Sequence, residues 1–342
     1  MKKMLKFTAW LTINRACNLR CSWCYAKMTN YNNNHMNLGI VKRSIDLFKS
    51  LSLKSVILIG GEPLIHPNFI DIVKMITKSG LKVYVVTNAM LFSNKKFLSK
   101  ALDAGVSSIT VSFKASNKED FKSFTGRDGF SKTLQAINNI AKEKIPYVIN
   151  VTACETLLEN FDEMIDVVVK TGARVFSVDT GKPIIIEGKT YADGMGTPKQ
   201  LSQFFMKIYQ KLERSGLRFS IKVAIPFCLF PKEFIDKIIK DGNILTGCQM
   251  VTGRGIILDP QGNLIPCNHV CDQSLGKIGN DFFNVSDYLK FRQKTEVSEF
   301  YKLVSTCPHK NCVSCSYWSM CGAGCKLYWL HYGADDLIGN FN

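Results

Sequence analysis

Short apolar runs alternate with amphipathic stretches along the first two-thirds of the chain. Runs rich in Val and Ile, apolar on both faces, predict buried strands at Thr8–Ile13, Ser55–Ile59, Lys82–Thr87, Ser107–Phe113, Tyr147–Ala153 and Arg174–Asp179. Apolar residues at helical spacing predict helices between them, at Leu38–Ser50, Asn68–Ser79, Asn94–Ala104, Ser131–Glu143 and Asn160–Lys170. This alternation predicts an α/β fold whose parallel sheet curls into a partial (β/α)6 TIM-like barrel.

The pattern changes near residue 225. A helical stretch near Thr197–Ser215 and a strand near Ser220–Ile225 are followed by dense cysteines. A short hairpin is predicted there, formed by Arg254–Leu258 and Leu264–Cys267. We therefore predict a barrel, a bridging segment and a small cysteine-rich domain with a β-hairpin and short helices, over residues 1–225, 226–247 and 248–342 respectively.

The composition is that of a folded protein, because 46% of the 342 residues are hydrophobic and 21% are charged. No apolar run approaches the roughly 20 residues that cross a bilayer. The N-terminal lysines precede an apolar patch that is short, is broken by Thr8 and Thr12, and lacks a small-residue cleavage site. These features argue against a secretory signal, so we expect a cytoplasmic protein without membrane association.

In a reducing compartment, the 13 cysteines are candidates for metal ligands rather than for disulfides. The net charge of +16 suits an acidic peptide, a nucleic acid or a phosphorylated substrate, or else reflects a solvated lysine-rich surface. The lysines are scattered, without a basic stripe or an aromatic RNA-binding strand, which argues against nucleic acid.

Three cysteines, Cys17, Cys21 and Cys24, follow the first predicted strand with the spacing C-x3-C-x2-C. Three thiolates can hold a [4Fe–4S] cluster and leave one iron open, whereas structural sites use four protein ligands. A zinc loop that takes a ligand from His35 or His66 is the alternative. The loop's position favours a catalytic role, because active sites of β/α barrels gather at the C-terminal ends of the strands.

This loop, with Trp23 before its last cysteine, resembles the signature of the radical S-adenosylmethionine (SAM) superfamily, and the resemblance covers essentially the whole chain. A second matching motif, Gly60-Gly61-Glu62-Pro63, directly follows the second predicted strand. Glycines there permit close backbone approach to a ligand, and a carboxylate accepts hydrogen bonds from an ammonium group. The resemblance implies that Glu62 binds the SAM amino group and that the cysteine loop holds the catalytic cluster. We expect Trp23 to shield the cluster and to pack against the adenine.

Other polar residues are expected at the barrel mouth, either as SAM contacts or as ordinary strand-end residues. Those near strand ends are Asn88 and Ser112. Arg127 is a candidate partner of the SAM carboxylate, and Asn150 and Thr152 are candidate contacts of the ribose or the methionine. Related sequences often carry Ser-x-Asp on the fourth strand, whereas this chain has Ser112-Phe113-Lys114, so any role of that Asp is lost or moved.

A second set of cysteines is similar to the SPASM extension found behind many radical SAM barrels, which carries two auxiliary [4Fe–4S] clusters. The resemblance assigns the first auxiliary cluster to Cys248, Cys267 and Cys325, and the second to Cys312, Cys315 and Cys321. Each set lacks one ligand. Cys307 is the candidate for the second cluster and Cys271 for the first, which otherwise keeps an open iron for substrate. Cys228 is an outside candidate. For the four regularly spaced C-terminal cysteines taken alone, a zinc knuckle is the alternative. Cys154, beside a strand, is expected in the hydrophobic core.

The resemblance implies a radical SAM oxidoreductase that modifies a ribosomally made precursor peptide, with a flavodoxin or a ferredoxin as electron donor. The modification is expected to be a crosslink, a thioether or an epimerisation, and the basic surface suits an acidic leader. We expect no fused leader-recognition domain before Thr8. Alternatives are a radical SAM enzyme for a small metabolite or an RNA base, and a zinc-stapled protein without catalysis. Sulfatase-maturase-like oxidation is disfavoured, because such enzymes carry an Asp that acts as a base where this chain has Asn268. His269 and Asp272 are the candidates that would replace this base.

Overall fold

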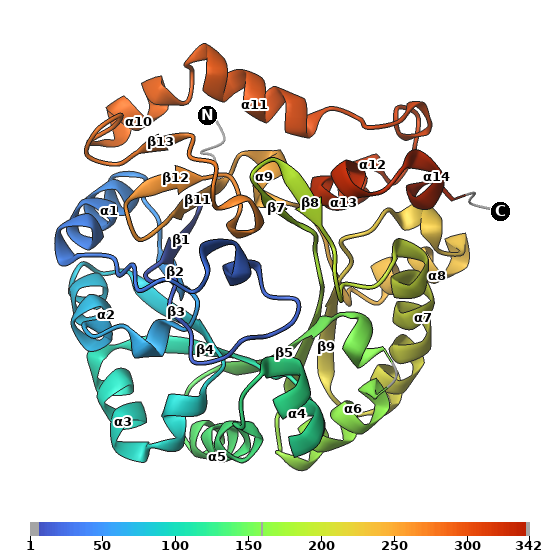
Figure 1. The fold of residues 1–342 in the computed structure, drawn as a ribbon, viewed down its shortest axis with the longest axis horizontal. Coiled ribbons are helices and arrows are strands. Elements are labelled where there is room, and N and C mark those ends of the chain that lie inside the picture. Colours follow the sequence, from blue (N-terminus) through green and yellow to red (C-terminus); the bar gives the residue numbers. More distant parts are fainter. Residues whose placement is uncertain (1–6, 159, 340–342) are drawn as a thin grey trace.

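The computed structural model describes residues 7–158 and 160–339, so the lysines of the N-terminal segment at residues 2, 3 and 6 lie outside the described residues. A curved wall of parallel strands forms the centre of the molecule (Figure 1). Its strands, in sheet order, are β1 (Thr8–Thr12), β2 (Ser55–Ile59), β3 (Lys82–Thr87), β4 (Val106–Ser112), β5 (Tyr147–Ala153), β6 (Val175–Thr180) and β9 (Arg218–Lys222).

Helices follow these strands along the chain and cover the outside of the wall, as Figure 1 shows. They are α1 (Leu38–Ser50), α2 (Phe69–Lys78), α3 (Lys95–Ala104), α4 (Lys118–Thr125), α5 (Phe130–Ala141), α6 (Phe161–Lys170), α7 (Pro198–Arg214) and α8 (Lys232–Lys240). The predicted (β/α)6 partial barrel is therefore confirmed, with strand β9 added beside β6.

Alternate positions along the strands have different surroundings. In β5, for example, Ile149 and Val151 are fully buried, whereas Asn150 and Thr152 between them are half-buried. Successive strand side chains point to opposite faces, so the fully buried set packs under the helices and the half-buried set points into the ring. The lumen of the barrel is thus bordered by side chains that keep some exposure.

The barrel does not close, because both ends of the sheet continue with other strands. Strand β10 (Ile244–Leu245) pairs with β9, and β11 (Gly255–Leu258) pairs in parallel with β1. Strands β12 (Asn263–Ile265) and β13 (Gly276–Lys277) extend that edge in antiparallel fashion. The predicted hairpin is present as β11–β12, and it belongs to the sheet of the barrel.

The C-terminal region is built of short helices, as predicted. They are α9 (Gln249–Thr252), α10 (Val285–Phe291), α11 (Thr295–Ser305), α12 (Trp318–Cys321), α13 (Lys326–His331) and α14 (Ala334–Leu337). Another hairpin, β7 (Ile184–Ile186) with β8 (Lys189–Tyr191), follows β6 and lies against the 3-10 helices η1 (Tyr25–Thr29) and η6 (Asn268–Val270). Within the described residues, no helix has the length and apolar character needed to span a membrane.

Candidate active site

The C-x3-C-x2-C loop leaves the end of β1 and lies over the middle of the ring of strands (Figure 1). Backbone N–H groups point at two of its sulfurs: Leu19 donates to Cys17 Sγ at 3.3 Å, and Ala26 donates to Cys24 Sγ at 3.4 Å. Cys21 is buried, and the other two cysteines are half-buried. Hydrogen bonds of this kind stabilise thiolates that ligate metal clusters.

The three cysteines also influence one another's pKa values electrostatically. Burial raises the pKa of Cys17, and the charges of Glu62, Cys24 and Cys21 raise it further. Burial raises the pKa of Cys21 to about 11 and raises that of Cys24 as well, while the Lys114 ammonium opposes both shifts. Thiolates that influence one another in this way need a cationic partner to be stable. An iron–sulfur cluster therefore fits this donor set.

The two glycines of the Gly60-Gly61-Glu62-Pro63 motif allow the end of β2 to touch the cysteine loop. A Cβ atom on Gly61 would lie 2.3 Å from the Ala16 carbonyl oxygen, and one on Gly60 would lie 2.1 Å from Asn14 Oδ1. Backbone hydrogen bonds follow the same approach, from Gly61 N to Asn14 O (3.0 Å) and from Glu62 N to Ala16 O (2.8 Å). The close approach seen here is to the chain's own backbone, whereas the sequence predicted close approach to a ligand.

Glu62 is 1% exposed, and its carboxylate is held on both oxygens. Oε1 accepts from Leu64 N (3.0 Å) and Thr87 Oγ1 (2.6 Å), and Oε2 accepts from Asn88 N (2.8 Å). Burial raises the pKa of Glu62, and these hydrogen bonds oppose the rise. A cation that docks beside this carboxylate would favour its ionised form.

Asn88 ties the end of β3 to the cysteine loop, because its Nδ2 donates to Asn18 Oδ1 at 2.7 Å. Trp23 is buried, with the Phe124 ring edge-on at 6.5 Å and the Lys114 ammonium 5.6 Å from its ring centre. Lys114 is itself buried and donates to Ser112 Oγ at 2.5 Å. The sequence motif Ser-Phe-Lys marked this position as a departure, but sequence reasoning gave the lysine no role.

The remaining predicted SAM contacts lie on β4, on β5 and just beyond α4. Ser112 and Asn150 are opposite each other in the β4–β5 register, and Asn150 Nδ2 donates to Ser177 Oγ at 2.9 Å. Thr152 is opposite Asp179 in the β5–β6 register. Arg127 is exposed just beyond α4, the helix whose last residue, Thr125, accepts a hydrogen bond from Arg20 N of the cysteine loop. Its side chain forms no hydrogen bond or ion pair within the described part of the chain, and its role as a SAM ligand stays a prediction.

Polar side chains at the end of β6 lie near the C-terminal cysteines. Lys182 Nζ pairs with Asp179 Oδ1 at 2.7 Å. Burial lowers the pKa of Lys182, but the Asp179 carboxylate, and after it the charges of Cys325 and Cys267, raise this pKa above its usual value. Burial raises the pKa of Cys267 to about 11 and that of Cys325 to about 12, and Cys248 raises both further. Cys248, Cys267 and Cys325 therefore lie within electrostatic reach of one another.

Residues next to this triad serve the packing of the barrel mouth. Asn268 Oδ1 accepts from Thr12 Oγ1 at 2.8 Å, and Asp272 Oδ2 accepts from Glu187 N at 3.3 Å. His269 lies 5.3 Å from the Tyr25 ring, and burial lowers its pKa to about 3. Its buried Nδ1 has no hydrogen-bond partner within the described residues. This unpaired nitrogen beside Cys267 leaves a polar atom that a bound molecule can satisfy.

Other candidates lie elsewhere. Cys271 packs in a small separate cluster with Ile257 and Ile265, so the structure does not bring it to the triad. His66 accepts from Asn68 N at Nδ1 (3.1 Å) and contacts the Met36 carbonyl oxygen through Nε2 (3.1 Å). Both ring nitrogens of His66 are thus engaged, which argues against the zinc alternative that uses it. Cys154 is buried in the core, as expected.

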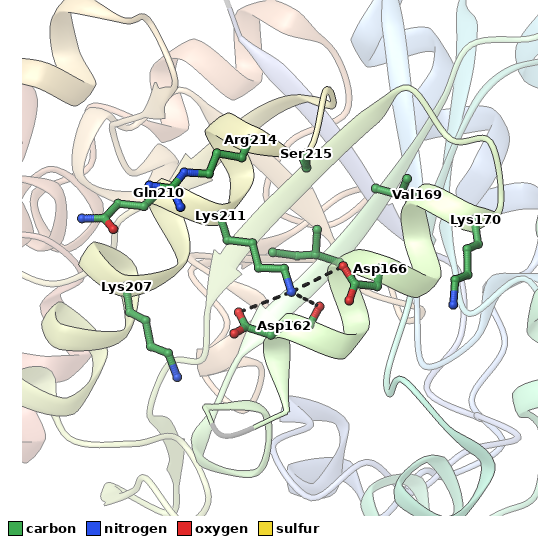
Figure 2. Close-up of a pocket in the computed structure, with 10 residues that line it drawn as sticks. Asp162, Asp166, Val169, Lys170, Lys207, Gln210, Lys211, Arg214 and Ser215 are labelled. Atoms are coloured by element: carbon green, nitrogen blue, oxygen red, sulfur yellow. Dashed lines mark hydrogen bonds and ion pairs between the residues drawn. The ribbon is translucent and has the colours of Figure 1, made fainter.

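A groove lies away from these sites, on the outer surface between α6 and α7 (Figure 2). Its volume is about 680 Å³, and its lining includes the basic side chains Lys170, Lys207 and Arg214. Lys211 is paired there with Asp162 at 3.9 Å and with Asp166 at 3.4 Å. This groove is a charged helix–helix surface and contains none of the cysteines.

Comparison with known proteins agrees with this geometry. Residues 11–167, which contain the cysteine loop, Glu62 and Asn88, match the family model described as the Radical SAM superfamily. This part of the chain is therefore a radical SAM domain, as the sequence resemblance predicted. Such a domain implies SAM and a [4Fe–4S] cluster as cofactors.

The chain matches curated proteins over part of its length. It is 30% identical over 175 residues to an AdoMet-dependent heme synthase of Methanosarcina barkeri, covering 51% of this chain and 50% of that protein. It is 27% identical over 176 residues to a probable GTP 3',8-cyclase of Thermococcus kodakarensis, covering 51% and 56%. The chain spans about half the length of the curated relatives it matches.

Similarity in fold extends over nearly the whole chain. The structure of native anSMEcpe with bound AdoMet and Cp18Cys peptide aligns with a TM-score of 0.70 at 18% identity, covering 98% of this chain and 92% of that one. Streptococcus suis SuiB bound to precursor peptide SuiA aligns with a TM-score of 0.72 at 14% identity, covering 98% and 75%. At these identities, the likeness shows a shared fold.

Proposed function

We propose that this protein is a radical SAM enzyme that removes a hydrogen atom from a peptide substrate and thereby modifies a ribosomally made peptide. The observation that carries the proposal is the buried Glu62 carboxylate, which Thr87 and Asn88 hold in place beside the loop of Cys17, Cys21 and Cys24. In this proposal, a one-electron donor such as a flavodoxin or a ferredoxin reduces the enzyme once per SAM cleaved.

When bound, the cluster and SAM supply the radical chemistry, in which an electron and SAM give methionine and a 5'-deoxyadenosyl radical that abstracts hydrogen to become 5'-deoxyadenosine. The chain's own residues have other tasks. Cys17, Cys21 and Cys24 hold the cluster, and Glu62 receives the SAM ammonium. The half-buried side chains of the lumen hold the substrate carbon near the radical and limit its contact with water.

Two observations favour a peptide substrate. The alignments with the peptide-bound anSMEcpe and SuiB structures cover 98% of this chain, whereas the matches to the heme synthase and to the probable GTP 3',8-cyclase each cover 51% of it. The lumen also offers a polar half, in which Asn150, Thr152 and the Asp179–Lys182 pair can bond to amide groups. The cysteine-rich region is then a SPASM-type domain with two auxiliary clusters.

The second candidate is a radical SAM enzyme for a small molecule. It is favoured by the sequence matches to a probable GTP 3',8-cyclase and to a heme synthase, each of which covers 51% of this chain. A sulfatase-maturase-like oxidation has less support. Asn268, which accepts a hydrogen bond from Thr12, stands where those enzymes carry an Asp that acts as a base.

The test is anaerobic reconstitution followed by reduction with dithionite in the presence of SAM. We expect release of 5'-deoxyadenosine, and loss of that release in a variant with Cys17, Cys21 and Cys24 all changed to Ala. The matched control is Cys154→Ala, which removes a buried cysteine outside both cysteine regions. Release that survives the triple substitution would refute the catalytic assignment.

The substrate is tested by co-expression with the small open reading frame next to the gene, followed by mass spectrometry. A loss of two hydrogens indicates a crosslink or an oxidation, and an unchanged mass with deuterium uptake indicates epimerisation. If 5'-deoxyadenosine release depends on GTP or on a tetrapyrrole instead, and the peptide stays unmodified, the small-molecule candidate replaces the peptide.

A further inference from the structure

A second group of cysteines surrounds a cavity far along the chain from the cysteine loop. The cavity has a volume of about 280 Å³, and its lining includes Cys228, Cys312, Cys315 and Cys321, with Phe227 and Trp318 beside them. Three of these cysteines belong to the C-x2-C-x5-C spacing predicted for the second auxiliary cluster. The fourth, Cys228, comes from the 3-10 helix η5 (Phe227–Leu229), which follows β9 of the barrel.

Contacts to the sulfurs resemble those at the cysteine loop. Phe227 N donates to Cys321 Sγ at 3.3 Å, and Gly339 N donates to Cys228 Sγ at 3.5 Å. The C-terminal segment is pressed onto Cys228, because a Cβ atom on Gly339 would lie 1.9 Å from the Cys228 carbonyl oxygen. The position of Cys228 is therefore fixed by chain segments on both sides of it.

Cys307 is nearer in the chain to Cys312 than Cys228 is, but it is not part of the described lining of the cavity. It lies beside Thr306, whose carbonyl oxygen accepts a hydrogen bond from Lys326 Nζ at 3.0 Å.

We propose that Cys228 supplies the fourth thiolate of this cavity, so that Cys228, Cys312, Cys315 and Cys321 enclose one [4Fe–4S] cluster with a closed ligand shell. Sequence reasoning favoured Cys307 because of its nearness in the chain. The four cysteines border a cavity of about 280 Å³, and this lining fits an iron–sulfur cluster.

A closed shell has a functional consequence. Four protein ligands leave no iron open to a small molecule, so this cluster would brace the fold or carry electrons rather than bind substrate. It would also join the end of the barrel to the C-terminal segment, since Cys228 lies between the two. This inference concerns a site separate from SAM cleavage, and its test does not depend on that activity.

The test measures iron and sulfide in the full chain, in a background where Cys17, Cys21 and Cys24 are Ala, so that the iron counted belongs to the C-terminal region. Cys228→Ala is expected to lose about four irons or to leave a three-iron cluster with its own electron paramagnetic resonance signal. Cys307→Ala and Cys154→Ala are the matched controls and are expected to retain the full content.

A second comparison guards against simple misfolding. Cys312→Ala is expected to remove the same iron as Cys228→Ala, and the double variant Cys228→Ala/Cys312→Ala is expected to lose no more than Cys312→Ala alone. Circular dichroism checks that the barrel remains folded. Full iron content in Cys228→Ala, loss of iron in Cys307→Ala instead, or zinc in place of iron would each overturn the proposal.

Discussion

At the scale of single residues, Glu62 is the side chain whose surroundings are most fully specified. Hydrogen bonds from Leu64, Thr87 and Asn88 fix its carboxylate, and burial raises its pKa. A buried carboxylate of this kind gains most from a cationic ligand, because the ligand offsets the loss of hydration.

The prediction is that Glu62→Gln weakens SAM binding while leaving the cluster in place. A hydrogen bond to a charged group contributes about 1.5–3 kcal/mol, so the dissociation constant should rise by roughly 10- to 100-fold. Isothermal titration of reconstituted protein measures the affinity, and iron content is determined on the same sample. Glu155→Gln, an exposed position, is the control. Unchanged affinity in Glu62→Gln would remove Glu62 from the SAM site.

His66 supplies a prediction about pH. Burial, and next the neighbouring His35, lower its pKa from 6.5 to about 4, against the opposing hydrogen bond to Met36. Between these values the unfolded chain binds a proton that the folded chain does not, so the free energy of unfolding falls as the pH falls. In His66→Gln, the slope of the free energy of unfolding against pH should be shallower, by an amount that corresponds to at most one bound proton. Urea unfolding at a series of pH values between 7 and 4.5 checks it, and an unchanged slope would contradict the assignment.

The spacing of the cysteines and the Gly-Gly-Glu-Pro motif made much of this site predictable, because both are local in the sequence. Lys114 and Cys228 are different. Lys114 matters through its distance to Trp23 and the cysteine loop, and Cys228 through a cavity shared with residues more than 80 positions away. No local pattern encodes such distances, so these roles emerge only once the chain is folded.

At the scale of elements, the strands of the barrel and six of its helices were predicted to within a few residues, because each carries its own periodicity, but α4 and α8 were not predicted. The β7–β8 hairpin was missed. Its strands have three residues each, and its turn, Glu187-Gly188, has φ values of +50° and +77°. Positive φ at both positions is the signature of a tight hairpin turn, but a Glu in the first position hides that signal in the sequence.

The junction between β2 and the cysteine loop gives a prediction at this scale. Gly61→Ala would place a methyl group 2.3 Å from the Ala16 carbonyl oxygen and 2.4 Å from that of Arg15. Because the obstacle is backbone, we expect a loss of about 1–3 kcal/mol in stability together with a lower iron content. Chemical denaturation and iron analysis measure the two effects.

The control for Gly61→Ala is Gly333→Ala. Gly333 has a φ of −72°, and the nearest atom to an added Cβ is Asp336 Oδ2 at 4.0 Å. Alanine is therefore accommodated there, and any effect common to both variants reflects the loss of glycine rather than crowding. Equal stability of the two variants would mean that the contact between β2 and the loop tolerates displacement.

At the scale of the whole molecule, the sheet connects regions that the sequence separates. The pairing of Thr8 with Gly255 through Leu11 with Leu258 places the cysteine-rich region directly beside the first barrel strand. Sequence periodicity predicted the hairpin but not its partner, because strand pairing across more than 240 residues depends on the topology of the complete sheet. The division into barrel, bridge and C-terminal domain stays a prediction, and the shared sheet indicates that their stabilities are coupled.

That coupling leads to a prediction about iron loading. If iron bridges Cys228 to Cys312, Cys315 and Cys321, it closes a long loop and should stabilise the C-terminal segment, as metal clips do. Amide hydrogen exchange in peptides covering residues 310–316 should then slow by about tenfold or more on reconstitution, which corresponds to about 1.4 kcal/mol or more of local stability. Exchange in α2 and α3 serves as the internal reference, because these helices lie on the far side of the barrel wall in Figure 1.

The same experiment on Cys228→Ala separates this bridge from the triad of Cys248, Cys267 and Cys325. Iron at the triad is expected to protect the segment around Cys325 in both proteins, whereas protection around Cys312 should disappear in the variant. If residues 310–316 gain equal protection without Cys228, the segment is held by its own cysteines alone. The barrel and the C-terminal segment would then be joined by the sheet and by packing, and not through iron.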